Sequence, residues 1–403
     1  MKHIVFVIGN YKNGGVAMHS TNLANAFAQV GYRVTILVTR EVSQNVYFEL
    51  NKNVQVVELS DYVEKHSRDK DIVKLFSGQE KIIRWLKRVR YATRYFRNID
   101  SVIADRIRGI RISRDISAFA TGNRDAVYIP FGVSYYEATY YGVKQFESKI
   151  IYAERNAPEL EYPEDEEKRD KLIGLVSMAD GVVLQTQTEK GFFKGNLKNA
   201  VVINNPLKAD LPERFTGERR KIIVNFCRIS KQKNLPLLFE AMVKLHKDYP
   251  DYVLEIYGNT VEKLEEDLCA EYNNLIKELS AEDYIKILPP SKEVHNLIRD
   301  CAMFVSSSDF EGLSNSMIEA MAIGLPCVCT DCLGGGAREV IKDGGNGLLV
   351  PMQNTEALYL AMKRIISDPE LAEQCSVNAR KIKDGLLLPV IADKWIDYIE
   401  RVI

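Results

Sequence analysis

Residues 303–326, MFVSSSDFEGLSNSMIEAMAIGLP, contain the parts of one βα unit in a single stretch. The apolar run that ends at Ser306 is typical of a buried parallel strand, and a loop with Gly312 follows it. The residues after Asn315 are expected to form a helix, which a glycine-proline turn at 324–326 ends. This strand-loop-helix order predicts a parallel sheet covered by helices.

The same alternation of short β-branched runs and longer helical segments recurs on both sides of this stretch. A first series of strands is predicted over residues 4–8, 34–39, 54–59, 127–130, 150–153, 182–185 and 201–204. A second series is predicted over 222–226, 253–257, 285–288, 303–306, 327–330 and 347–350. The expected fold class is therefore α/β with two doubly wound parallel sheets, which would hold a ligand cleft between the carboxyl ends of their strands.

A boundary between the two series is predicted at Pro206. Prolines at 206 and 212 and a polar stretch up to Lys221 are typical of a linker between domains. We therefore expect a first domain over residues 1–206 and a second that begins at 207, which agrees with 403 residues at roughly 100–200 residues per domain.

Composition excludes several classes of protein. With 46% hydrophobic residues, 27% charged residues and a net charge of −1, the chain is neither disordered nor suited in bulk to nucleic acid. The first residues read as a strand rather than a signal peptide, and no apolar run is long enough to span a membrane. Seven cysteines, an odd count, are expected to be reduced thiols. We expect a cytoplasmic protein, with a peripheral position on the inner face of the membrane as an option.

Three glycine loops and a set of charges are candidates for an anion site. Gly15 follows the first strand, Gly312 follows the strand at 303–306, and a triple glycine stands at 334–336. Glycines at strand-to-helix turns let backbone N–H groups approach a phosphate at a helix N-terminus. Arg228 and Lys233 follow a strand and would face the same cleft. Packing glycines and a solvated surface loop are the alternatives.

A basic segment is hidden by the neutral total. From Lys65 to Arg114 there are fifteen basic residues against five acidic ones, so the segment carries +10 and the rest of the chain −11. An apolar helical stripe is predicted there at Ile82, Leu86, Val89, Thr93 and Phe96, flanked by Arg84, Lys87, Arg88 and Arg94 and by Trp85, Tyr91 and Tyr95. This pattern suits an anionic membrane surface or a polyanionic acceptor, and an ordinary helix packed on the sheet is the alternative.

The residues from Ser307 to Pro326 resemble the E-x7-E signature of the retaining glycosyltransferases of the GT-B fold, specifically glycosyltransferase family 4 (glycosyl transferases group 1). The resemblance covers nearly the whole chain, and the stretch 334–351 and the Arg228/Lys233 pair agree with it. It implies a first Rossmann-like acceptor domain over 1–206 and a second Rossmann-like domain over 207–384 that binds the nucleotide-sugar donor. It also implies a C-terminal helix over 385–403 that packs back on the first domain.

The resemblance implies a role for each matching residue. Arg228 and Lys233 match the cations that hold the donor diphosphate and stabilise the leaving nucleoside diphosphate, and Glu311 matches the carboxylate at the donor sugar. Glu319 matches the carboxylate at the ribose hydroxyls. The loop residues implied in donor binding are Gly15, Gly312, Leu313, Ser314 and Asn315. Such enzymes need neither a metal nor another cofactor, because cations and the helix dipole meet the charge of the leaving group.

Two positions depart from the family pattern. Cys227 stands where members usually have a glycine before the arginine. In place of the histidine that many members carry beside the reacting sugar, the first domain has Glu154, Arg155 and Asn156, which resemble a variant found in surface-polysaccharide transferases. These three residues are candidates for the acceptor side, with a structural salt bridge as the alternative for Glu154 or Arg155.

Other patterns were weighed against these. Cys327, Cys329 and Cys332 have a spacing that could suggest a metal, but strand alternation favours packing, so no metal site is predicted. The histidines 19, 246 and 295 are expected on helix surfaces. The leading hypothesis is transfer of a hexose or N-acetylhexosamine from a nucleotide sugar, with UDP favoured, to a surface-glycan or lipid-linked acceptor. A catalytically silent partner or glycan-binding protein is the alternative, followed by a phosphorylase or a nucleotide-sugar epimerase.

Overall fold

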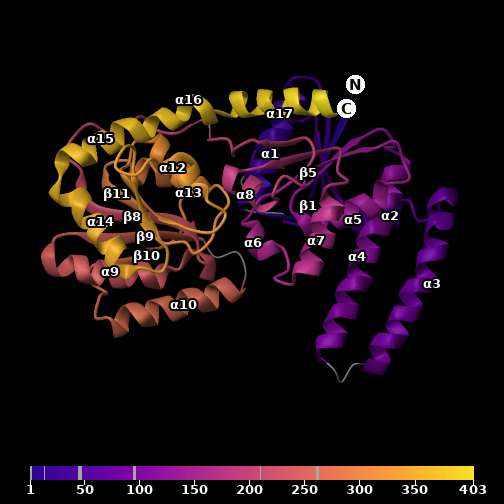
Figure 1. Cartoon of the computed structure of the whole chain (residues 1–403), viewed down its shortest axis with the longest axis horizontal. Helices are drawn as coiled ribbons and strands as arrows, with labels where there is room; N and C mark the ends of the chain where they lie inside the picture. The colour runs from indigo at the N-terminus through magenta and orange to yellow at the C-terminus, as the bar shows by residue number, and fades with distance from the viewer. Residues whose placement is uncertain (1, 13, 44–47, 94–96, 209, 260–262) are drawn as a thin grey trace.

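The computed structural model describes residues 2–12, 14–43, 48–93, 97–208, 210–259 and 263–403. Within the predicted linker, Ala209 lies outside these ranges, and within the predicted apolar stripe Arg94, Tyr95 and Phe96 do so. Asn13, just before the first glycine loop, is also outside them, and the side chain of Thr93 is not described. Two α/β bodies lie side by side in Figure 1, and the N- and C-termini are close together at one edge of the first.

The first body is built on seven parallel strands of the described chain, in the order β3-β2-β1-β4-β5-β6-β7. Alternate residues of the strand over 3–11 enter two different cores, with Phe6 in one and Val7 in the other. Such burial on both faces is typical of parallel sheets with helices on each side. The strands are β1 (His3–Tyr11), β2 (Arg33–Val42), β3 (Val54–Glu58), β4 (Val127–Pro130), β5 (Lys149–Ala153), β6 (Gly181–Leu184) and β7 (Ala200–Val202).

The second body has six described parallel strands in the order β10-β9-β8-β11-β12-β13. Again alternate residues enter different cores, as Phe304 and Val305 of β11 do. The predicted α/β class with two doubly wound sheets is confirmed. The strands are β8 (Arg220–Arg228), β9 (Val253–Asn259), β10 (Ile285–Leu288), β11 (Cys301–Ser306), β12 (Cys327–Asp331) and β13 (Leu348–Pro351).

Helices connect the strands and cover both sheets (Figure 1). In the first body these are α1 (Gly15–Gln29), α2 (Leu59–Lys65), α3 (Lys70–Thr93), α4 (Arg97–Thr121), α5 (Val133–Val143), α6 (Pro158–Glu161), α7 (Glu166–Val176) and α8 (Gln187–Phe192). In the second they are α9 (Leu235–Asp248), α10 (Lys263–Glu278), α11 (Val294–Ile298), α12 (Asn315–Ala322), α13 (Gly336–Val340), α14 (Thr355–Ser367), α15 (Pro369–Ala379) and α16 (Lys383–Leu386).

The last helix, α17 (Leu388–Val402), returns to the first body, as the sequence predicts (Figure 1). Its Trp395 is fully buried, and the hydroxyl of Tyr398 accepts a hydrogen bond of 2.7 Å from the backbone N–H of Val182 in β6. Trp395 shares one core cluster with Phe6 of the first sheet and Phe304 of the second. A single apolar core therefore runs through both bodies and α17.

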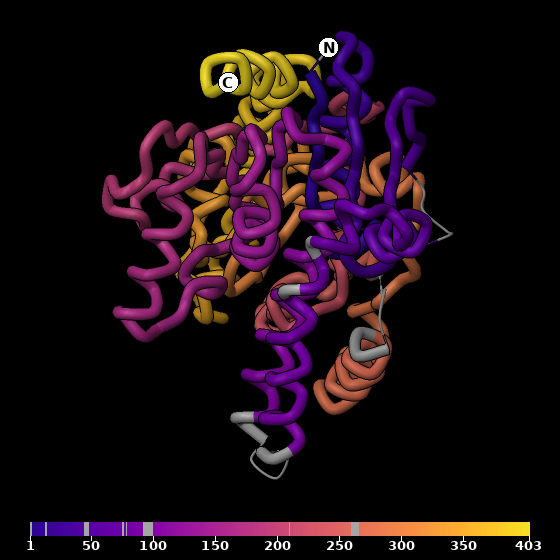
Figure 2. The backbone as a smooth tube through the Cα atoms, turned by 90° about the vertical axis from the view of Figure 1, so that its right-hand side faces the viewer, coloured from indigo at the N-terminus to yellow at the C-terminus, as the bar shows by residue number. Residues whose placement is uncertain are grey.

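The basic segment forms α3 and α4, which lie against each other and extend away from the first body (Figure 2). The apolar stripe predicted for α3 begins at Ile82, and the prediction that this residue is buried is wrong. Ile83 is 1% exposed and Ile82 is 51% exposed, because α3 packs its Ile72/Ile83 face toward α4 rather than onto the sheet. Leu86 and Val89, which the predicted stripe also includes, are half-buried.

The prediction of surface histidines is wrong for two of the three. His19 in α1 is 3% exposed and His295 in α11 is 6% exposed. His19 lies four residues before Leu23 and eight before Phe27, on the face of α1 that packs on the sheet. His295 points at the second body's core, next to Phe226. His246 is half-buried and stacks on Tyr284 with ring centres 3.6 Å apart.

No helix among the described residues is both long enough and apolar enough to cross a lipid bilayer.

Candidate functional site

The second domain places a lysine and a glutamate together at the carboxyl ends of β8 and β11. A single 3-10 turn (Lys231–Lys233) follows β8, and the Lys233 ammonium forms an ion pair with Oε1 of Glu311. Both side chains are 14% exposed. Burial is the largest single influence on the pKa of Lys233 and lowers it, but the neighbouring groups, with the charge and hydrogen bond of Glu311 foremost, together outweigh it, and the pKa lies above its ordinary value. Lys233 is therefore cationic at neutral pH.

Hydrogen bonds fix the loop that carries Glu311 to the turn that carries Lys233. The hydroxyl of Ser307 donates to the carbonyl oxygen of Lys233 at 2.9 Å, and the amide of Asn234 donates to Asp309 at 2.9 Å. Asn234 has a φ of 41°, in the left-handed region that asparagine tolerates better than most residues. The ion pair therefore belongs to a rigid strand-end structure rather than to a mobile surface loop.

Arg228 is the last residue of β8 and is exposed, five residues before Lys233 on the same strand end. The two predicted cations are thus on one edge of the sheet, one open to solvent and one buried. Burial raises the pKa of the preceding Cys227 thiol to about 11, so this side chain is neutral beside them.

The loop before α12 lies directly against the first domain. Ser314 is the N-cap of α12 and makes no side-chain capping hydrogen bond, so its hydroxyl does not occupy the N–H groups of the first turn of this helix. The N–H of Leu313 donates to Oε1 of Gln185 at 3.3 Å. An added Cβ at Gly15 would lie 3.4 Å from Nδ2 of Asn315, which places the first glycine loop beside the start of α12.

Glu319 lies one turn into α12 and is 5% exposed. Its Oε2 is 2.9 Å from Nε2 of His295, and its Oε1 is 3.9 Å from the ammonium of Lys208 in the interdomain segment. The second carboxylate of the predicted E-x7-E pair is therefore held by two partners, one of them a histidine that was expected on the surface.

The second and third glycine loops pack on each other. A Cβ at Gly336 would be 1.7 Å from the carbonyl oxygen of Gly312, so only glycine allows this approach. The carbonyl of Gly334 accepts a hydrogen bond of 2.8 Å from the hydroxyl of Thr186 in the first domain. The structure thus brings together the three glycine loops that the sequence singled out.

In the first domain, the three candidate acceptor residues follow β5. Glu154 is fully buried. It accepts a hydrogen bond of 2.5 Å from the hydroxyl of Tyr152 and one of 2.8 Å from the N–H of Arg155. Burial, and then the charge of Glu161, raise the pKa of Glu154 to about 8. Asn156 contributes its N–H to the same carboxylate at 3.3 Å. Glu154 is therefore protonated at neutral pH and committed to internal contacts.

Arg155 differs from Glu154 in having unused hydrogen-bonding groups. Its guanidinium lies 4.6 Å from the ring centre of Phe131 and 5.5 Å from that of Trp395. Nη1 donates to Asn205 at 3.4 Å, whereas Nε and Nη2 are buried without a hydrogen-bond partner among the described residues. Burial lowers the pKa of Arg155 to about 10, and the group remains a cation.

Sequence reasoning missed several polar residues next to Arg155. Both ring nitrogens of His19 are buried without a partner among the described residues, and burial, together with the charge of Arg155, holds the pKa of His19 well below its ordinary value. Glu189 in α8 is also buried, and burial and then the charge of Glu154 raise its pKa well above the usual range. The spacing of His19 to Leu23 and Phe27 could have shown that it faces inward.

Asn205 joins the two halves of the site. Its Oδ1 accepts from Nε2 of Gln185 at 2.7 Å, and its Nδ2 donates to the carbonyl of Leu313 at 2.9 Å and to Oδ1 of Asn315 at 3.0 Å. The donor-loop residues and the first-domain cluster therefore form one hydrogen-bonded network.

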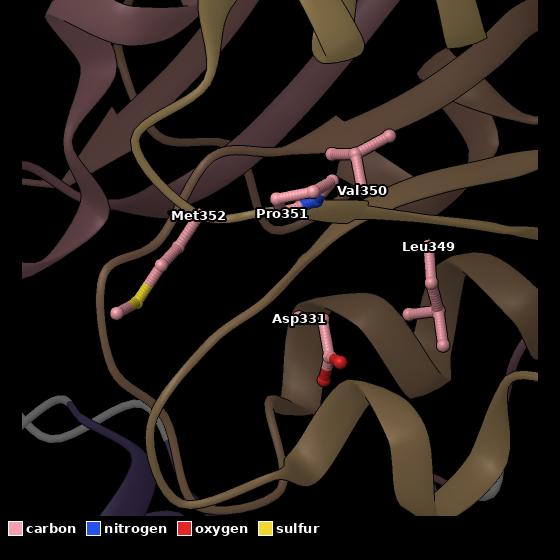
Figure 3. A pocket seen from close by; sticks show the side chains of 5 residues that line it. All are labelled: Asp331, Leu349, Val350, Pro351 and Met352. Atoms are coloured by element: carbon pink, nitrogen blue, oxygen red, sulfur yellow. The ribbon is translucent and has the colours of Figure 1, made fainter.

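Two other features lie apart from this network. A depression of about 380 Å³ lies at the ends of β12 and β13. Figure 3 shows the side chains that line it, namely Asp331, Leu349, Val350, Pro351 and Met352. None of the predicted site residues lines it. Cys327, Cys329 and Cys332 are buried free thiols, and burial raises the pKa of Cys332 to about 12. Within the described ranges, no three His, Cys, Asp or Glu side chains are grouped so that they could hold a metal.

Comparison with known proteins shows which proteins this chain is similar to. Residues 209–382 match the family model of the glycosyl transferases group 1. An uncharacterized glycosyltransferase of Haemophilus influenzae is 25% identical over 398 residues, which are 98% of this chain and 99% of that protein. A Campylobacter jejuni protein named N-acetylgalactosamine-N,N'-diacetylbacillosaminyl-diphospho-undecaprenol 4-alpha-N-acetylgalactosaminyltransferase is 35% identical over 160 residues, 40% of this chain and 41% of its own.

Among solved structures, a mutant of S. aureus TarM in complex with fondaparinux, alpha-GlcNAc-glycerol and UDP has a TM-score of 0.73 at 13% identity, over 99% of each chain. The two facing Rossmann-like domains and the returning α17 are thus those of the GT-B fold, as the sequence predicts. Together, the family match and the full-length relative support a glycosyltransferase with the GT-B fold.

Proposed function

We propose that the chain is a retaining, metal-independent glycosyltransferase. In this proposal it moves a hexose or N-acetylhexosamine from a UDP-sugar to a hydroxyl of a surface-glycan or lipid-linked acceptor. The observation that carries the proposal is the largely buried Lys233–Glu311 ion pair, whose Glu311 lies in the loop just before the N-terminus of α12. The UDP in the TarM complex and the diphospho-undecaprenol in the name of the Campylobacter relative support the choice of donor and acceptor class.

The donor diphosphate would bind at the carboxyl edge of the second sheet. Lys233 and Arg228 supply positive charge there, and the N–H groups of Leu313, Ser314 and Asn315 point from the N-terminus of α12, which favours anions. The Leu313 amide now bonds to Gln185, so donor binding would exchange this partner for a phosphate oxygen. We assign Glu319 to the ribose hydroxyls and Gly15 to the opposite wall.

The transfer step requires charge stabilisation on the departing group. The bond between the anomeric carbon and the diphosphate oxygen breaks with its electron pair on that oxygen, where Lys233 and Arg228 oppose the growing negative charge. The acceptor hydroxyl forms its bond on the same face, and its proton passes to the departing diphosphate. Glu311, freed from Lys233 as the donor binds, would hold a hydroxyl of the transferred sugar.

On the acceptor side, the unpaired nitrogens favour Arg155 over its neighbours. Glu154 spends both carboxylate oxygens on internal hydrogen bonds, whereas Arg155 retains Nε and Nη2. A buried N–H donor without a partner costs free energy, because it has lost its hydrogen bond to water. A ligand oxygen that accepts a hydrogen bond from this donor would remove that cost. We therefore assign Arg155 to ligand contact and Glu154 and Asn156 to holding it in place.

Calorimetric titration with UDP tests donor binding. Lys233→Ala should weaken UDP binding by about 10–100-fold, since a charge-assisted hydrogen bond contributes about 1.5–3 kcal/mol. Lys231→Ala removes an exposed lysine from the same turn and is the matched control, with binding close to wild type. A wild-type protein that does not bind UDP would favour the silent-partner alternative.

Transfer itself is tested by screening UDP-sugars for hydrolysis and then for transfer to glycan and lipid-linked acceptors. Glu311→Gln should abolish transfer. Glu282→Gln makes the same change at an exposed carboxylate outside the candidate site and serves as the control. NMR of the product should show the anomeric configuration of the donor, and a chelator should leave the rate unchanged. Activity of Glu311→Gln near wild type, or an inverted product, would reject the assignment.

A further inference from the structure

The α3–α4 pair is the most strongly charged part of the molecule and the most separate from its body. In Figures 1 and 2 the two helices extend together away from the first sheet. The segment from Lys65 to Arg114 carries +10, and the remaining chain −11. The positively charged segment is therefore separated in space from the negatively charged remainder of the protein.

The cations of α4 are largely used within the protein. Arg114 pairs with Glu80 at 2.6 Å and with Asp115 at 2.8 Å, and its guanidinium lies over the ring of Phe76. Arg108 lies 3.1 Å from Asp105 and Arg106 3.8 Å from Glu137. These contacts pair three of the arginines of α4 with acidic residues and attach α4 to its neighbours.

The outer face of α3 is different. The Ile72/Ile83 face packs toward α4, and the opposite face presents cations at helical i, i+3/i+4 spacing. These exposed cations, which we call the α3 basic stripe, are Lys70, Lys74, Lys81, Arg84 and Arg88. None of these five side chains forms an ion pair with an acidic residue of the described chain. Glu80, next to Lys81 in sequence, is held by Arg114, and the other acid of α3 is Asp71 in its first turn.

A large aromatic residue accompanies the stripe. Trp85 is 62% exposed on α3, which is unusual for a side chain that is mostly apolar. Val73 and Ile82 on the same helix are 52% and 51% exposed. A helix with basic residues along one face and exposed Trp and aliphatic side chains beside them has the composition of helices that lie at a membrane interface.

We propose that the α3 basic stripe and Trp85 dock the protein on an anionic phospholipid bilayer. Charge complementarity favours this partner, because a juxtamembrane basic cluster gains about 1 kcal/mol for each Lys or Arg near an anionic surface. The acidic body is repelled by the same surface, so the molecule orients with α3 toward the lipid. This inference does not depend on the proposed reaction, since binding can be measured without turnover.

The test is sedimentation of the full chain with vesicles of phosphatidylcholine alone or with phosphatidylglycerol added. The wild type should sediment only with the anionic vesicles, and less as salt rises. Lys81→Glu/Arg84→Glu/Arg88→Glu should lower the partition coefficient on the order of 100-fold. The matched control, Lys198→Glu/Lys286→Glu/Lys342→Glu, changes the net charge equally on exposed residues elsewhere and should bind like wild type. Circular dichroism checks that both variants are folded.

Tryptophan fluorescence gives an independent readout. The chain has two tryptophans, and Trp395 is fully buried, so a vesicle-induced blue shift reports Trp85 and should vanish in Trp85→Phe. Equal binding to both kinds of vesicle, or full binding by the α3 triple variant, would overturn the proposal. So would stripe-dependent binding to a soluble polyanion such as heparin without binding to vesicles, which would indicate a polyanionic acceptor instead.

Discussion

The two halves of the candidate site differ in how far their polar groups are satisfied by the chain itself. In the second domain, Lys233 is paired with Glu311, and Glu319 with His295. In the first domain, Arg155 and His19 are buried with nitrogens that have no partner among the described residues. Unpaired buried polar groups destabilise the folded state, so their presence at a site calls for an explanation such as ligand binding. The second half is prepared as a self-supporting anion site, whereas the first half retains hydrogen-bonding capacity for a ligand.

The largest change in the free energy of unfolding is expected when the Lys233–Glu311 ion pair of the second domain is broken. Lys233→Ala leaves the Glu311 carboxylate in a site that is 14% exposed, and should lower the free energy of unfolding by about 3–5 kcal/mol. Urea denaturation measures it. Lys233→Ala/Glu311→Ala removes both charges and should regain part of the loss. Simple additivity of the two single variants would show that the pair is not coupled.

The next effect concerns Glu154 and depends on pH. Its folded pKa is raised from the ordinary 4.5 to about 8, so its stabilisation is full below pH 4.5 and is lost as the pH rises through 8. Glu154→Gln stays neutral and should gain about 2–4 kcal/mol relative to wild type between about pH 5 and pH 9. Thermal unfolding of both proteins across this range gives the difference. If the difference in stability between the two proteins stayed constant over this pH range, Glu154 would not titrate within it.

A smaller effect is expected at the residue that connects the halves. Asn205→Ala removes hydrogen bonds to Gln185, Leu313 and Asn315, and should cost about 1–3 kcal/mol in unfolding free energy. Asn204→Ala, at the neighbouring position, removes a single bond of 2.8 Å to the carbonyl of Gln185 and should cost less. Equal losses in chemical denaturation would contradict a bridging role for Asn205.

The smallest effect tests the contrast directly with two histidines. His19→Phe removes two unpaired buried nitrogens and should leave the free energy of unfolding unchanged or raise it by about 1 kcal/mol. His295→Phe removes the partner of Glu319 and should lower it by about 1–3 kcal/mol. Differential scanning fluorimetry ranks the two variants. A larger loss at His19 would show that its ring has an internal partner.

The same contrast explains what the sequence could predict. Glu311, Glu319 and the glycine loops lie on consecutive parts of βα units, so local spacing revealed them. Gln185, Glu189, Asn205 and His19 come from separate units and meet only through the arrangement of strands, which leaves no local signature. The partnership of Glu319 with His295 is likewise a contact between two helices rather than a pattern.

The register of α3 could not be predicted for a different reason. Ile82 and Ile83 are adjacent, and each begins a plausible apolar stripe. The choice is made by α4, which packs against the Ile83 side and forms the ion pair from Arg90 to Asp100 at 2.8 Å. A helix that packs on another helix instead of on a sheet has a narrow buried face, and composition alone does not locate it.

The return of α17 to the first domain has a consequence for synthesis. Translation completes the first sheet early, but the side chains of α17 that cover part of it, Trp395 and Tyr398 among them, are made only after the second domain. While the second domain is being translated, the first presents an apolar surface that has no cover. The first domain is therefore the earlier one to be made and the later one to be finished, and its apolar surface stays exposed until α17 has been made.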